Sequence, residues 1–97
     1  MKYVLHPDAA EEHRRQVTYY EAKQPGLGKR YHAEFRKSVH DACDKLVQYQ
    51  IVYPPNIRRI TFKIFKFDLI YREVDGVIQV LAVANHSRRP GYWLQRL

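Results

Sequence analysis

The sequence predicts an α+β domain in which a helical hairpin packs on one face of a small, mainly antiparallel four-stranded sheet. Two stretches in the first half carry apolar residues at helical spacing and are separated by a short turn. The second half holds three apolar or alternating stretches with short connections, which are typical of antiparallel strands. A chain of 97 residues can build two packed layers, so we expect residues 1–97 to form a single domain with the order β-α-α-β-β-β.

The N-terminal segment predicts a short strand followed by a helix. Residues 2–6 are partly apolar and form a short strand that Pro7 ends, and we place this strand at an edge of the sheet. Pro7 and Asp8 favour the first turn of a helix, because proline suits that position and an acid complements the helix dipole. We expect the helix to end near Lys23. Four of its residues share one face at helical spacing: Ala10, His13, Val17 and Tyr20.

A second helix follows a turn at Pro25-Gly26-Leu27-Gly28. Because this connection is short, the two helices should form an antiparallel hairpin. The second helix is predicted to run to Tyr49, before Tyr53-Pro54-Pro55 blocks any continuation. Its apolar stripe recurs at steps of three and four residues: Leu27, Tyr31, Phe35, Val39, Ala42, Leu46 and Tyr49.

Three strands are predicted in the second half. Arg58 and Arg59 open the first of them, and residues 60–64 alternate between apolar and polar side chains, which indicates a half-buried strand. A turn or bulge must follow at 65–67. Residues 69–74 form the next strand. Asp75-Gly76 is a hairpin signal. The last strand begins at Val77 and is apolar on both faces, which is typical of a central strand.

The charge is uneven along the chain. The formal net charge is +7, and residues 56–97 hold eight Lys and Arg against three Asp and Glu. Such a field favours an anionic partner, either nucleic acid or an acidic protein, although a merely solubilising surface is the alternative. Cys43 is the only cysteine, so an intrachain disulfide and a cysteine-based zinc site are excluded, and a reducing cytoplasm fits. No run is apolar enough to span a membrane, and we expect no metal or other cofactor.

Basic and aromatic side chains of the strand-rich half are the candidate contacts for a target or a nucleic acid. Arginine and lysine can hold phosphates or carboxylates. Tyr92 and Trp93 offer either stacking surfaces for bases or a means of holding the C-terminal tail on the sheet. We expect the residues after Ser87 to be functional rather than structural. The candidates are Arg58, Arg59, Lys63, Arg72, Arg88, Arg89, Tyr92 and Trp93.

His86 follows the last predicted strand and can exchange a proton near neutral pH. RNA cleavage through a 2′-OH needs a general base, a general acid and cationic help at phosphorus. His86, Tyr92 and Arg59 can supply these roles if the protein is a nuclease. The alternative is a histidine that only terminates the strand.

Several short motifs in this order resemble the RelE/ParE superfamily of bacterial toxins from type II toxin–antitoxin modules, in particular its ParE-like plasmid-stabilisation members. Together they span nearly the whole chain, and the fold of that superfamily matches the predicted one. The motifs are His6-Pro7-Asp8-Ala9, Tyr19-Tyr20-Glu21, Pro25-Gly26-Leu27-Gly28, Tyr53-Pro54, Arg58-Arg59, Leu69-Ile70-Tyr71, Val80-Leu81-Ala82-Val83-Ala84 and Arg88-Arg89-Pro90-Gly91-Tyr92-Trp93.

The resemblance implies a cytoplasmic toxin that inhibits bacterial growth and is neutralised by a cognate antitoxin protein. ParE-like members poison DNA gyrase and are not enzymes, whereas RelE-like members are metal-independent endoribonucleases that cleave mRNA on the ribosome. Arg59 and Tyr92 match the RelE-type positions, but Asp68 places a negative charge where that chemistry wants a cation. We therefore expect a ParE-like gyrase inhibitor. The alternatives are a ribosome-dependent mRNA interferase and a homologue that has lost toxicity.

Overall fold

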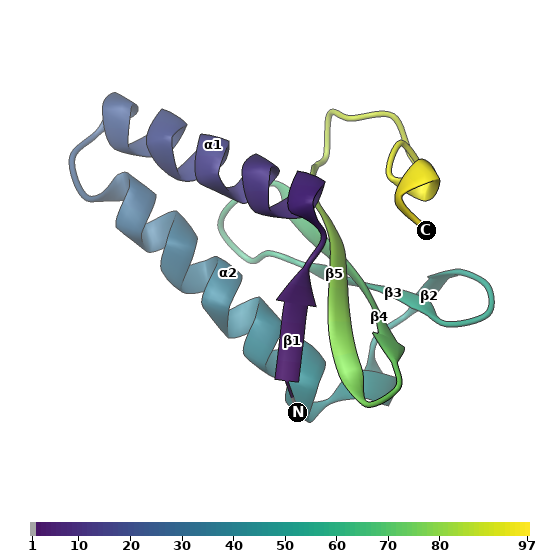
Figure 1. The fold of residues 1–97 in the computed structure, drawn as a ribbon. Coiled ribbons are helices and arrows are strands. Elements are labelled where there is room, and N and C mark those ends of the chain that lie inside the picture. The colour runs from purple at the N-terminus through teal and green to yellow at the C-terminus, as the bar shows by residue number, and fades with distance from the viewer. Residues whose placement is uncertain (1) are drawn as a thin grey trace.

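The computed structural model describes residues 2–97 and has the α+β architecture that the sequence predicts (Figure 1). Two antiparallel helices lie on one face of a mixed sheet, and the C-terminal tail lies on the other face. The elements in chain order are β1 (Lys2–Leu5), α1 (Pro7–Lys23), α2 (Leu27–Asp44), the 3₁₀ turn η1 (Leu46–Gln48), β2 (Ile51–Tyr53), β3 (Ile57–Thr61), β4 (Phe67–Val74), β5 (Val77–Asn85) and the 3₁₀ turn η2 (Leu94–Arg96).

The sheet of residues 2–97 has five strands in the order β1-β5-β4-β3-β2, so the expectation of four strands was wrong. The additional strand, β2, pairs antiparallel with β3 at one edge and is only three residues long. Such a short stretch in front of two prolines carries no readable periodicity. At the other edge β1 pairs parallel with β5, which confirms the edge position predicted for the first strand.

The first helix begins and ends as predicted, but the residue that it buries differs. Pro7 occupies the first turn, and the backbone N–H of Asp8 donates to the His6 ring at 3.1 Å. Ala9 is fully buried, whereas Ala10 is exposed. The second helix ends at Asp44 rather than Tyr49, and a 3₁₀ turn carries the apolar stripe onward. A stripe of apolar residues therefore does not by itself fix the helix end.

Two glycines make the turn between the helices possible. Gly26 adopts a left-handed φ of 89°. Gly28 lies so close to α1 that a Cβ atom there would be 2.7 Å from the carbonyl oxygen of Val17. The carboxylate of Glu21 accepts the N–H groups of both glycines, at 2.9 and 3.0 Å. Glu21 thus satisfies donors that the start of α2 leaves free.

The strand that follows β2 ends earlier than predicted. It covers Ile57–Thr61 and so includes Arg58 and Arg59, but it stops before residues 62–64, and Ile64 is 66% exposed. The predicted turn lies at residues 65–67, where the N–H of Phe67 donates to the carbonyl of Phe65. The hairpin signal at Asp75-Gly76 is confirmed, because both residues have positive φ between β4 and β5.

The sheet buries apolar side chains on both faces. The larger core lies between the sheet and the helical hairpin and includes Tyr31, Phe35 and Phe67. The smaller core lies on the opposite face, where Trp93 of the tail packs with a group of strand residues and is 6% exposed. The tail is therefore part of the packed structure, contrary to our expectation for the residues after Ser87. The strand residues of this smaller core are Ile57, Ile70, Leu81 and Ala82.

Candidate functional site

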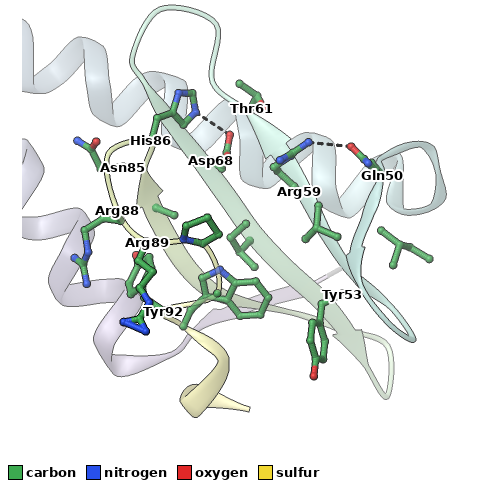
Figure 2. A pocket seen from close by; sticks show the side chains of 17 residues that line it. Gln50, Tyr53, Arg59, Thr61, Asp68, Asn85, His86, Arg88, Arg89 and Tyr92 are labelled. Atoms are coloured by element: carbon green, nitrogen blue, oxygen red, sulfur yellow. Dashed lines mark hydrogen bonds and ion pairs between the residues drawn. The ribbon is translucent and has the colours of Figure 1, made fainter.

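An open groove of about 870 Å³ lies on the sheet face opposite the helices (Figure 2). Its floor is formed by the ends of β3, β4 and β5, and its walls are β2 and the C-terminal tail. We call it the basic groove. Its charged and polar lining residues are Gln50, Arg59, Thr61, Asp68, Asn85, His86, Arg88, Arg89 and Tyr92.

The alternation of side chains along β3 places Arg59 in the basic groove. Ile57 belongs to the smaller core on this face, so Arg59 and Thr61 point the same way. The guanidinium group of Arg59 donates to the Oε1 atom of Gln50 at 2.9 Å. Gln50 precedes β2 and also accepts the backbone N–H of Arg59. A neutral amide thus holds Arg59 and leaves its charge uncompensated.

His86 and Asp68 form a pair at one end of the basic groove. The Nε2 atom of His86 lies 3.0 Å from Oδ1 of Asp68 (Figure 2). The backbone N–H of His86 donates to the carbonyl of Lys66, which fixes the residue beside the β3–β4 connection. The carboxylate of Asp68 therefore has the His86 imidazole as a partner and is not an unpaired acid in the groove. A carboxylate in this position can orient the ring.

The segment after β5 brings two arginines to the opposite wall. The side chain of Asn85 accepts the backbone N–H and the hydroxyl of Ser87, both at 2.8 Å, and so turns the chain at the strand end. The guanidinium carbon of Arg88 then lies 3.9 Å from the centroid of the Tyr92 ring. Arg88 and Arg89 are exposed, so both can reach a ligand in the groove.

One carboxylate, that of Glu12 on α1, holds the C-terminal tail in place. It accepts the Tyr92 hydroxyl at 2.6 Å, two guanidinium N–H groups of Arg96 at 2.9 Å each, and the backbone N–H of Val83 at 3.1 Å. Arg96 also donates to the carbonyl of Leu81. We call this set of contacts the Glu12 clasp.

The Glu12 clasp sets the ionisation of its members. Burial alone would raise the pKa of Glu12, but hydrogen bonds from Arg96 and Tyr92 hold that pKa below its usual value. Burial raises the pKa of the Tyr92 hydroxyl well above its usual range, and the hydrogen bond to Glu12 raises it further. Glu12 is therefore an anion at neutral pH, and Tyr92 holds its proton.

Some of the candidate site residues predicted from the sequence share the basic groove, and the others lie elsewhere. The groove is lined by Arg59, His86, Arg88, Arg89 and Tyr92. The hydroxyl of Tyr92, however, is bound to Glu12. Trp93 also borders the groove, but its ring is buried in the smaller core, which agrees with the expected alternative that it holds the C-terminal tail on the sheet.

Three predicted contact residues lie outside the basic groove. Arg58 donates to the carbonyl of Tyr49 at 2.6 Å and, by the alternation along β3, points to the helix side. Lys63 borders a second groove, of about 780 Å³, between α2 and β3. Arg72 donates to Gln79 at 2.8 Å. These three candidates therefore do not share a groove with Arg59.

Sequence reasoning missed Gln50, Asn85, Glu12 and Arg96. Glu12 sits beside Glu11 on a helix with many charges, so nothing in the pattern sets it apart. Over residues 2–97 no group of three His, Cys, Asp or Glu side chains is placed to hold a metal ion. No helix in the described part of the chain is long and apolar enough to cross a membrane.

Comparison with known proteins adds two findings. The family model described as the ParE toxin of the type II toxin–antitoxin system parDE matches residues 3–90. A solved structure described as the chromosomal ParDE TA system from P. aeruginosa is similar in fold, with a TM-score of 0.75 and 17% sequence identity. The match covers 88% of this chain and 95% of that one. A search of curated proteins gives no match.

Proposed function

The chain belongs to the ParE toxin family of type II toxin–antitoxin systems, and on this basis we propose that it inhibits bacterial growth by binding DNA gyrase, without catalysing a reaction itself. The proposed working surface is the basic groove. A cognate antitoxin would neutralise the toxin by covering that surface.

The observation that carries the non-catalytic part of this proposal is the state of the proton-transfer groups in the basic groove. The Tyr92 hydroxyl donates to Glu12 at 2.6 Å and has a raised pKa, so it is a poor general acid. Asp68 lies 3.0 Å from His86 and would repel the negative charge that develops on a phosphorane. This arrangement suits binding better than phosphodiester cleavage.

Three arginines give the basic groove the means to bind an anionic surface. Arg59, Arg88 and Arg89 line it and make no ion pair with an acid within residues 2–97. A guanidinium group can hold a carboxylate or a phosphate through two parallel hydrogen bonds. The groove therefore fits an acidic segment of a target protein or of an antitoxin.

The His86–Asp68 pair supports a second candidate function, that of a ribosome-dependent mRNA interferase. A histidine whose ring is oriented by a carboxylate is a common arrangement for a general base. Arg59 would then provide the cation near phosphorus. This candidate requires Tyr92, or another group, to act as the acid.

Two assays on purified protein separate these candidates. We expect the wild type to inhibit supercoiling by gyrase, and Arg88→Ala to require about tenfold or more protein for the same inhibition, the size of effect seen when a charge-assisted contact is lost. Lys29→Ala, an exposed change on α2 away from the groove, is the matched control. Primer extension on a translated message provides the second assay. Codon-phased breaks that appear with the wild type and disappear in His86→Ala would refute the gyrase proposal.

The antitoxin is testable separately. A partner with an acidic, partly disordered segment can wrap the basic groove and fold as it binds. We expect pull-down from the native host to recover a small acidic protein, and Arg59→Ala combined with Arg89→Ala to weaken its binding in a salt-dependent manner. Recovery of no such protein would contradict this part of the proposal.

A further inference from the structure

The wall of the basic groove depends on a contact between residues that are 80 positions apart. Glu12 on α1 accepts the Tyr92 hydroxyl at 2.6 Å, and the Tyr92 ring lies against the guanidinium group of Arg88 at 3.9 Å. Arg88 has no ion pair within residues 2–97 that would hold it otherwise. The turn at Asn85 places the backbone of Arg88, and the Tyr92 ring positions its guanidinium group.

We propose that Glu12 is the positioning residue of the basic groove: through Tyr92 it places Arg88 against the ligand, and through Arg96 it keeps the tail on the sheet as the groove wall. This inference rests on the proposed function, because it assigns Glu12 a role in whatever binds there. Glu12 itself does not line the groove.

The energetics of the Glu12 clasp favour one fixed arrangement. The side chains of Arg96 and Glu12 are 10% and 16% exposed, and two parallel hydrogen bonds join them. Removing the carboxylate would leave the nearly buried guanidinium group of Arg96 with only the carbonyl of Leu81 and a longer, 3.7 Å contact to Asp8, which is costly. The tail would then be held less firmly on the sheet, and the guanidinium group of Arg88 would lose its fixed position against Tyr92.

The neighbouring glutamate shows that this role is specific to one position. Within residues 2–97, Glu11 bonds only to Arg14 and Arg15 of its own helix, and it is more exposed than Glu12. Glu11→Ala removes the same carboxylate from the next position and leaves the tail contacts intact. It is therefore the matched control for Glu12→Ala.

The first measurement reports the tail without reference to any target. Trp93 is the only tryptophan and is 6% exposed in the smaller core, so its fluorescence reports whether the tail is docked. We expect acrylamide to quench it more strongly in Glu12→Ala and in Arg96→Gln, with an unchanged far-UV spectrum, and equally in Glu11→Ala and wild type. Arg96→Gln removes the cation that Glu12 pairs with, and it carries the test if Glu12→Ala does not fold. Unchanged quenching in folded Arg96→Gln would overturn the role of Glu12 in holding the tail.

The second measurement separates positioning from a general loss of structure. Growth arrest on controlled expression is scored for Tyr92→Phe, for Arg88→Ala and for the double variant, at matched protein levels. If Tyr92 acts through Arg88, Tyr92→Phe raises the fraction of cells that escape growth arrest by about tenfold or more in the wild-type background, because a hydrogen bond to a charged group usually contributes that much. In the Arg88→Ala background, the same substitution should change this fraction little. An equal loss in both backgrounds would overturn the positioning role.

The failure of this inference and that of the proposed function look different. Growth arrest without inhibition of gyrase refutes the proposed target, yet the comparison of backgrounds still stands, since it does not depend on which target is bound. Full arrest by Arg88→Ala, with Trp93 still docked, overturns the positioning role because Arg88 would then not be needed.

Discussion

His13 should make the stability of the helical hairpin depend on pH. Its ring stacks on Phe35 with centroids 3.8 Å apart, and its Nε2 atom lies 2.8 Å from Nδ1 of His32. Its Nδ1 atom is buried without a hydrogen-bond partner within residues 2–97. Burial, and to a smaller extent the charge of His32, lowers the pKa of His13 from 6.5 to about 4. The folded protein thus keeps this ring neutral.

The sign and size of the effect follow from linkage between protonation and folding. Because the folded pKa is lower than the unfolded one, the unfolded chain binds more protons between pH 6.5 and about 4. The contribution of His13 is complete above pH 6.5 and is lost progressively as the pH falls toward about 4. The ceiling is about 3 kcal/mol, and because solvent still reaches part of the ring, we expect about 1–2 kcal/mol.

Urea unfolding at several pH values in this window measures the effect. His13→Phe keeps a ring against Phe35 but cannot take up a proton, so its free energy of unfolding should fall less with acidification than that of the wild type, by about 1–2 kcal/mol. His40→Gln, at an exposed position of α2, should follow the wild type. Parallel curves for wild type and His13→Phe would refute the reasoning.

Three further predictions concern the turn, the tail and the basic groove. Gly28→Ala should lower the free energy of unfolding by about 1–3 kcal/mol in urea titrations, because the new Cβ meets the backbone of Val17. A chain truncated after Ser87 should lose about 3–5 kcal/mol or fail to fold, judged by its far-UV spectrum and melting curve, because Trp93 leaves the smaller core; an unchanged melting curve would show that the tail is dispensable. Asp68→Asn should tighten binding of an acidic peptide about fivefold or more at low ionic strength, measured by calorimetry, with a smaller gain at high salt; a gain that does not vary with salt would contradict this electrostatic cause.

The elements that the sequence could predict are those with local signals. Pro7 predicts the start of α1, and the glycines around residue 26 predict the turn between α1 and α2. Asp75-Gly76 predicts the hairpin between β4 and β5. Each of these depends on the conformational preference of one or two residues. The central position of β5 follows from a run that is apolar on both faces.

The parts that could not be predicted depend on register or on distant contacts. β3 begins at Ile57, and side chains alternate along a strand, so Arg58 and Arg59 lie on opposite faces although they are adjacent in sequence. The Glu12 clasp joins residues 71 to 84 positions apart, and no periodic pattern in the tail predicts it. These parts of the candidate site are therefore set by tertiary structure.

The distribution of ion pairs bears on the meaning of the basic charge. Within residues 2–97, Arg96 is the only Lys or Arg of the strand-rich half that pairs with an acid, and its partners are Glu12 and Asp8. Arg58, Arg59 and Arg72 donate to neutral oxygen atoms instead, which fix the side chains without cancelling their charge. A surface that only needed solubility would gain nothing from fixing its cations in this way. Because Arg59, Arg88 and Arg89 also share one groove, the charge favours an anionic partner over a merely solubilising role.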